Sequence, residues 1–146
     1  AEWLRGCHEI YQQIYPQNTF LLLPDNLPRA IVSVSPELLQ QAMDKLVDNA
    51  VSFASDRIIM LQMRVEHSMT PSVVTLSVGN HGPKISESDA VHWFNPLVSH
   101  RQTSSSELHM GLGLYMVRLI AQSAGGKTVA RNQSGWVVFG LSLPLT

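Results

Sequence analysis

Two glycines open the stretch of this 146-residue chain whose residue types and spacing point most directly to chemistry. Gly111 and Gly113 form a Gly-Leu-Gly-Leu run, and the apolar segment that follows has the length of a helix and stops at Gly125 and Gly126. Glycines at a helix start let backbone N–H groups approach a ligand closely, and the positive end of the helix dipole favours anions such as phosphate. The run therefore indicates a phosphate site. Close packing of a helix on a core uses the same short pattern, so these residues alone leave both interpretations open.

A second candidate is Asn49, which lies in a segment with the pattern of an amphipathic helix over residues 36–54. Ser35 can cap this helix, and Pro36 suits its first position. At about 100° per residue, one broad arc collects the apolar side chains. These are Leu38, Leu39, Ala42, Met43, Leu46, Val47, Ala50, Phe53 and Ala54. Asn49 falls inside the arc, and a buried amide without partners costs roughly 1–3 kcal/mol. The fold, water or a ligand must therefore satisfy it.

Five short stretches together resemble the sequence boxes of the ATP-binding catalytic domain of sensor histidine kinases, in the superfamily shared with DNA gyrase, Hsp90 and MutL. The stretches are LVDNA at 46–50, VGNHGPKI at 78–85, WFNPLV at 93–98, GLGL at 111–114 and GWVVF at 135–139. They occur in the family's order, and the resemblance spans nearly the whole chain. Residues 44–51 and 97–101 look closest to the kinases of proteobacterial dedicated sortase systems.

The resemblance implies a fold, cofactors and partners. The implied fold is α+β, a two-layer α/β sandwich of the Bergerat type, with a mixed, mostly antiparallel sheet covered on one face by about three helices. Residues 1–146 would form one domain that binds ATP and Mg²⁺, and Asn49 would bind the metal through its side-chain oxygen. The phosphoacceptor His would lie on the protein's own dimerisation domain outside this chain, and a response regulator would receive the phosphate.

The resemblance also implies a set of nucleotide-binding residues. Gly82 would let the backbone pass close to the adenine, and Asn80 would accept a hydrogen bond from the adenine amine. Residues 95–110 would form a lid, from which Arg101 could reach a phosphate oxygen or remain a solvated charge. The full set is Lys45, Asn49, Ser52, Phe53, Asn80, Gly82, Ile85, Arg101, Met110, Gly111, Leu112, Gly113, Leu114 and Val137.

Several departures from the family pattern fall on this site. Lys45 stands one turn before Asn49, where relatives commonly have Asn or Glu; it is either a solvated edge residue or a phosphate contact. Asn80 stands where the family usually has Asp, so the acceptor carries no charge. Ser52, Lys84, His109, Met110 and Val137 also replace more usual residues. These departures fall on residues expected to set nucleotide affinity and lid closure, whereas Asn49, the expected metal ligand, matches the family pattern.

The amino-acid composition limits the kinds of partner that this chain can bind. A formal net charge of −1, from ten basic and eleven acidic residues, provides no basic footprint for nucleic acid or for an anionic membrane surface. The 45% of hydrophobic residues suffices for a real core. Because no apolar run has the length of a membrane span and no signal-peptide pattern is present, we expect a cytoplasmic domain, and the resemblance implies a dimeric full-length protein in the inner membrane.

The order of expected elements fits one sheet with helices on one face, since strands and helices do not alternate regularly. Paired glycines at 125 and 126 should terminate the last helix. Helices are expected over residues 2–15, 36–54 and 111–124, with a short one near 86–94. Strands are expected over residues 19–23, 30–34, 57–66, 73–78, 127–131 and 136–143. Residues 95–110 are expected to form a loop.

The sequence is compatible with three functions. The first is a kinase domain that phosphorylates a His elsewhere. The second is a degenerate regulatory module that binds a nucleotide or a protein without kinase activity. The third is a stand-alone ATPase, which is disfavoured because Lys45 occupies the position of the water-activating Glu and cannot act as a base while charged.

Overall fold

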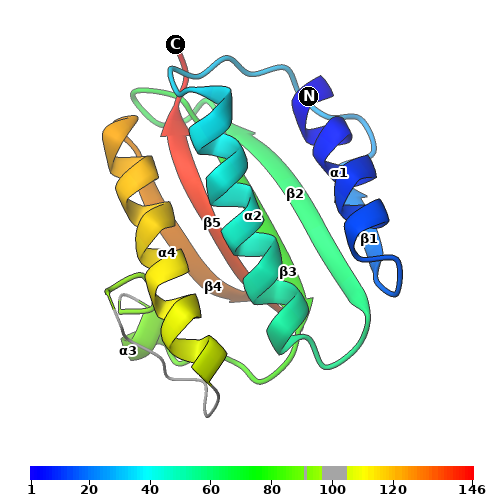
Figure 1. The fold of residues 1–146 in the computed structure, drawn as a ribbon. Coiled ribbons are helices and arrows are strands. Elements are labelled where there is room, and N and C mark those ends of the chain that lie inside the picture. The colour runs from blue at the N-terminus through cyan, green and yellow to red at the C-terminus, as the bar shows by residue number, and fades with distance from the viewer. Residues whose placement is uncertain (91, 97–104) are drawn as a thin grey trace.

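The computed structural model of this protein describes residues 1–90, 92–96 and 105–146, without the side chains of Glu87, Asp89 and residues 105–111. A five-stranded sheet in the order β1-β2-β3-β5-β4 carries helices on one face (Figure 1). The elements are α1 (Glu2–Ile14), β1 (Thr19–Leu23), α2 (Pro36–Phe53), β2 (Ile58–Glu66), β3 (Val73–His81), α3 (Glu87–Ala90), α4 (Ser105–Ser123), β4 (Lys127–Gln133) and β5 (Trp136–Pro144).

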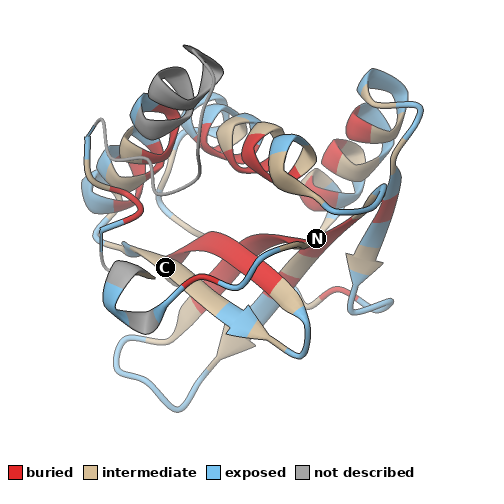
Figure 2. Ribbon diagram, turned by 90° about the horizontal axis from the view of Figure 1, so that it is seen from below, coloured by how far each residue is buried: buried red, intermediate tan, exposed pale blue. Residues whose placement is uncertain are grey.

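The sheet is mixed and mostly antiparallel. β1 runs parallel to β2, with Thr19 opposite Ile58, whereas the β2–β3, β3–β5 and β4–β5 pairs are antiparallel. Helices α1, α2 and α4 lie side by side over the same face, and Figure 2 shows their buried residues turned toward the sheet. The expected two-layer α/β sandwich is confirmed.

The core fills the space between these two layers. Met43, Leu46 and Val47 of α2 are fully buried, as are Leu141 and Leu143 of β5. These positions follow the helical and the alternating period respectively, so one face of each element supplies the core. The core therefore fixes the rotation of α2 about its axis, which decides where Asn49 points.

Local signals set the ends of the helices. The Ser35 hydroxyl accepts a hydrogen bond from the Leu38 N–H at 3.1 Å, as expected of a cap. At the end of α4, Gly125 has φ of +76° and the Gly126 N–H donates to the Ala121 carbonyl at 2.8 Å. The paired glycines thus stop α4 as predicted, because glycine adopts this left-handed conformation without a Cβ clash. None of the helices within the described ranges has an apolar run long enough to cross a membrane.

Two expected elements are wrong. Residues 30–34 make no strand; Val32 forms only an isolated bridge to Leu145. Pro36 restricts the residue before it and starts α2 at once, which leaves too little chain for a ladder. The last helix starts at Ser105, six residues before Gly111. Glu107, Leu108 and Met110 are good helix formers, which explains why the helix extends beyond the glycines.

Candidate functional site

Asn49 lies on the buried face of α2. Its side chain is only 2% exposed, and its Nδ2 atom has no hydrogen-bond partner. No hydrogen bond found among the described residues involves the Asn49 amide. Since an unpaired buried amide costs roughly 1–3 kcal/mol, the position is one that a polar ligand would stabilise.

Asn80 is the second buried amide of the site. It lies near the end of β3, between Ile59 of β2 and Val137 of β5, and it is completely buried. Its Nδ2 donates to the His81 carbonyl at 3.0 Å, while its Oδ1 has no partner. Because a carbonyl can only accept, this bond fixes the amide orientation and leaves Oδ1 as a bare acceptor.

Gly82 lies where the end of β3 meets the end of α2. A Cβ at this position would be 3.0 Å from the Phe53 carbonyl oxygen and 3.1 Å from the Asn80 Nδ2. The Ser55 N–H also donates to the His81 carbonyl, at 2.7 Å. These contacts bring together Phe53, Asn80 and Gly82, which are three of the residues expected at the site.

His81 forms a clamp that the sequence did not reveal. Its Nδ1 lies 2.7 Å from the Asp56 Oδ2, and its ring stacks on Trp136 with the centroids 3.8 Å apart. The Ile58 N–H donates to the other Asp56 carboxylate oxygen at 3.0 Å, and this bond, followed by His81, lowers the pKa of Asp56. The clamp holds the backbone beside Asn80. Its partners are 25 residues apart, so no local pattern could have indicated it.

Lys45 and Gly113 meet where α2 packs against α4. A Cβ at Gly113 would lie 3.2 Å from the Lys45 Cδ, so the aliphatic part of the lysine covers the glycine. Leu114 is buried beside them, whereas Leu112 is 48% exposed. The structure therefore joins one residue of the Gly-Leu-Gly-Leu run to the α2 face that also carries Asn49.

The expected backbone cradle at Gly111 and Gly113 is absent from this structure. Both glycines lie inside α4, more than four residues from its start at Ser105, so their N–H groups belong to the helical ladder. Only the first four N–H groups of a helix are free, and here these belong to residues 105–108. Residues 97–104 of the expected lid, which include Arg101, lie outside the described residues, as does the side chain of Met110.

The remaining expected residues lie around this centre. Val137 is buried, and Ser52 is exposed with no hydrogen bond in the described part of the chain. Ile85 is tied to Asn132 of β4 by two bonds: its N–H donates to the Asn132 Oδ1 at 3.1 Å, and its carbonyl accepts from the Asn132 Nδ2 at 2.7 Å. The Asn132 side chain of β4 thus fixes the Ile85 backbone.

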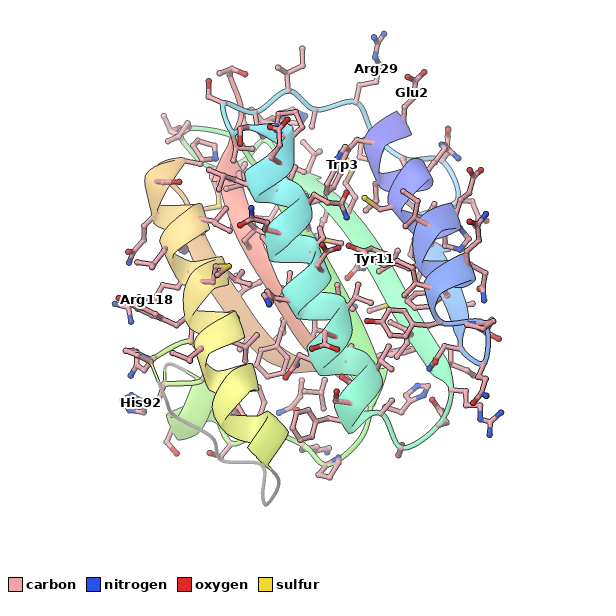
Figure 3. The ribbon with its side chains drawn as sticks, viewed as in Figure 1. Glu2, Trp3, Tyr11, Arg29, His92 and Arg118 are labelled. Atoms are coloured by element: carbon pink, nitrogen blue, oxygen red, sulfur yellow. The ribbon has the colours of Figure 1, made fainter. Side chains whose placement is uncertain are left out.

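The segment after α3 is anchored to α4 and to the sheet. The Arg118 Nη1 donates to the Asn95 Oδ1 at 2.8 Å, and Asn95 in turn contacts His92. Figure 3 shows Arg118 and His92 together on the outer side of α4. Trp93 and Phe94 are buried and pack edge-on against Phe139 of β5. These contacts hold residues 92–95, at the start of the expected lid.

Comparison with known proteins agrees with this geometry. A family model described as histidine kinase-, DNA gyrase B-, and HSP90-like ATPase matches residues 34–146. The adaptive-response sensory kinase SasA of Prochlorococcus marinus is 31% identical over 113 residues, which cover 77% of this chain but only 29% of SasA. The chain therefore spans less than a third of the length of that relative.

Two solved structures show the same fold. The catalytic domain of histidine kinase ThkA, in a nucleotide-free form, matches with a TM-score of 0.69 and 25% identity over 98% of this chain and 90% of that one. ThkA in complex with the response regulator protein TrrA matches with a TM-score of 0.76 and 23% identity, over 99% of this chain and 40% of that one.

Proposed function

The chain belongs to the family of histidine kinase-, DNA gyrase B-, and HSP90-like ATPases, and from this premise we propose that it binds ATP with Mg²⁺ around Asn49 and donates the γ-phosphate to a His outside residues 1–146. In this proposal residues 1–146 are one catalytic domain of a two-component sensor histidine kinase. The observation that carries the proposal is the buried Asn49 amide without a hydrogen bond in the described structure.

The donor atoms fit the metal. An amide oxygen is a hard ligand of the kind that Mg²⁺ accepts, and the Asn49 Nδ2 has no hydrogen-bond partner in the described structure that would hold the amide in another orientation. When bound at Asn49, Mg²⁺ would supply positive charge that offsets the negative charge of the phosphates during transfer. The protein's own contribution is the rigid placement of Asn49 by the buried face of α2.

The residues expected at the adenine end of the site also suit their ligand. The Asn80 Oδ1 offers a single acceptor without a partner, which suits the exocyclic amine of adenine and opposes the carbonyl of guanine. Gly82 keeps the backbone free of a side chain next to the Phe53 carbonyl. We assign base recognition to Asn80 and Gly82, with His81 holding Asn80 in position.

The site favours phosphoryl transfer over hydrolysis of ATP. Lys45 stands one turn before Asn49, and a charged lysine cannot take a proton from water. Within this proposal the acceptor His lies on a dimerisation domain in the part of the protein that this chain does not span, with a response regulator as the next acceptor. A homodimer anchored in the inner membrane, with this domain in the cytoplasm, completes the proposed arrangement.

A second function has a specific observation in its favour. Because the N–H groups of Gly111 and Gly113 are used inside α4, the backbone cradle expected for the phosphates is missing from this structure. A degenerate regulatory module that binds nucleotide weakly, or a protein instead, would be consistent with this arrangement.

Isothermal titration calorimetry with ATP separates these functions. We expect Mg²⁺-dependent binding that Asn49→Ala abolishes and that Asn26→Ala, at an exposed loop position, leaves unchanged. In the full-length protein, ATP labelled at the γ-phosphate should then yield an acid-labile phosphohistidine. No ATP binding by the unmutated chain in the presence of Mg²⁺ would rule out the kinase and favour the protein-binding module. Vigorous ATP hydrolysis by this chain alone would favour the stand-alone ATPase.

A further inference from the structure

Lys45 is a half-buried cation on the same face of α2 as Asn49, one helical turn before it. No hydrogen bond or ion pair of Lys45 occurs among the described residues, whose two ion pairs are Arg64–Glu66 and His81–Asp56. Its aliphatic stem packs on Gly113, and within the described residues its ammonium group has no anionic partner that would compete with a ligand.

Packing on α4 places the aliphatic stem of Lys45. The stem of Lys45 lies against Gly113, at a distance that any side chain on residue 113 would disturb. Gly113 therefore provides the surface against which the lysine stem packs. Its own N–H group is used within α4 and does not face a ligand. Among the described residues at this contact, Lys45 supplies the cationic group that can attract phosphate.

The nearest carboxylate in sequence is occupied elsewhere. The Asp44 Oδ1 accepts a hydrogen bond from the Tyr11 hydroxyl at 2.6 Å and another from the Gln40 Nε2 at 2.9 Å. Figure 3 shows Tyr11 directed from α1 toward α2, on the opposite side of α2 from α4. Asp44 is thus held on the α1 side, away from the Gly113 surface against which Lys45 rests.

From these observations we infer that Lys45 is a specificity residue that binds the polyphosphate of the nucleotide and shares charge neutralisation with Mg²⁺. This inference rests on the proposed function, because it requires a nucleotide at Asn49. A fixed cation next to the phosphates makes ATP binding less dependent on Mg²⁺ than binding through Asn49 alone would be. It also favours nucleotides with phosphate groups over the bare nucleoside.

Calorimetry on three variants of this chain tests the inference, with ATP and adenosine as probes, each with Mg²⁺ and with EDTA. Lys45→Met keeps the stem on Gly113 and removes the charge. We expect it to weaken ATP binding about tenfold with Mg²⁺ and by a larger factor in EDTA, and to leave adenosine binding unchanged. Lys45→Arg keeps the charge and should recover most of the affinity. Lys127→Met, the same chemical change at an exposed position of the edge strand β4, should change nothing.

The outcomes distinguish the inference from its premise. Equal ATP affinities of the unmutated chain and Lys45→Met, in both Mg²⁺ and EDTA, would overturn the role of Lys45 while leaving the nucleotide site intact. An equal loss of ATP and adenosine binding would also overturn it, because it would show a packing role. If the unmutated chain binds neither ATP nor adenosine, the proposed function itself fails.

Discussion

The Asn80 Nδ2 atom donates to the carbonyl of the adjacent residue His81 at 3.0 Å, which leaves the Asn80 Oδ1 as a buried acceptor without a partner. The same carbonyl also accepts from the Ser55 N–H. One backbone oxygen thus orients the side chain that we assign to base recognition and joins it to the end of α2. An amide suits this position, because it has both a donor for the His81 carbonyl and an acceptor for the base, whereas an ionised carboxylate has no donor.

Asn80→Asp should therefore weaken the protein instead of restoring the more usual residue. The carboxylate would face the His81 carbonyl, acceptor against acceptor, in a fully buried position. We expect the free energy of unfolding to fall by about 1–3 kcal/mol at pH 7, with no gain in ATP affinity. Urea denaturation and calorimetry measure the two effects, and Asn26→Asp in the exposed loop is the matched control. A variant as stable as the unmutated chain that binds ATP more tightly would contradict this assignment.

The contact between α1 and α2 depends on one tyrosine. The Tyr11 hydroxyl donates to the Asp44 carboxylate at 2.6 Å and accepts from the Gln40 Nε2 at 2.9 Å. Tyr11→Phe leaves these polar groups with fewer partners, so we expect a loss of about 1–2 kcal/mol in the free energy of unfolding. Tyr15→Phe is the control, since no hydrogen bond of the Tyr15 hydroxyl occurs in the described structure. Similar losses in both variants, measured by urea denaturation, would show that the hydroxyl of Tyr11 adds nothing.

Cys7 should make the protein less stable at alkaline pH. Burial, and secondly the Asp44 charge, raise the pKa of the Cys7 thiol from 9.0 to about 11. The unfolded chain thus loses this proton first, so the stabilisation is complete below pH 9 and disappears as the pH rises to about 11, an effect of roughly 2–3 kcal/mol. Burial also raises the pKa of Tyr11, which adds to the trend.

Cys7→Ser isolates the contribution of the thiol, because serine does not titrate in this range. The free energy of unfolding of this variant should fall less between pH 9 and pH 11 than that of the unmutated chain. In the native protein at pH 8, iodoacetamide should leave Cys7 unmodified, and labelling should require urea. Rapid native labelling would show that the thiol is accessible.

The parts of the site that the sequence predicts are those set by local spacing. Ser35 and Pro36 mark the start of α2, and the helical period places Asn49 on the buried face. Gly125 and Gly126 mark the end of α4. Each of these features depends on residues within a few positions of one another, so a single stretch of sequence contains the information.

The parts that the sequence did not predict depend on contacts between distant residues. Nothing near His81 indicates that it pairs with Asp56 and stacks on Trp136. His8 is similar: its Nε2 lies 2.6 Å from the Phe20 carbonyl and caps the outer edge of β1, although its sequence context is that of an ordinary helix residue. The start of α4 is a different case, since two glycines suggested a boundary that the helix-forming residues before them overrode.

Gly113→Ala tests whether Gly113 lies inside a helix and supports Lys45. In a helix interior, alanine is more favourable than glycine by about 0.8–1.0 kcal/mol. The new methyl group would lie 3.2 Å from the Lys45 Cδ, a contact that the flexible stem can relieve by a small shift. We therefore expect the free energy of unfolding to rise by up to about 1 kcal/mol while ATP affinity falls and adenosine affinity stays the same. Urea denaturation and calorimetry on one variant measure both changes. A loss of stability would place Gly113 in a conformation that requires glycine, as at a helix start, and unchanged ATP affinity would show that the position of the Lys45 stem does not matter for phosphate binding.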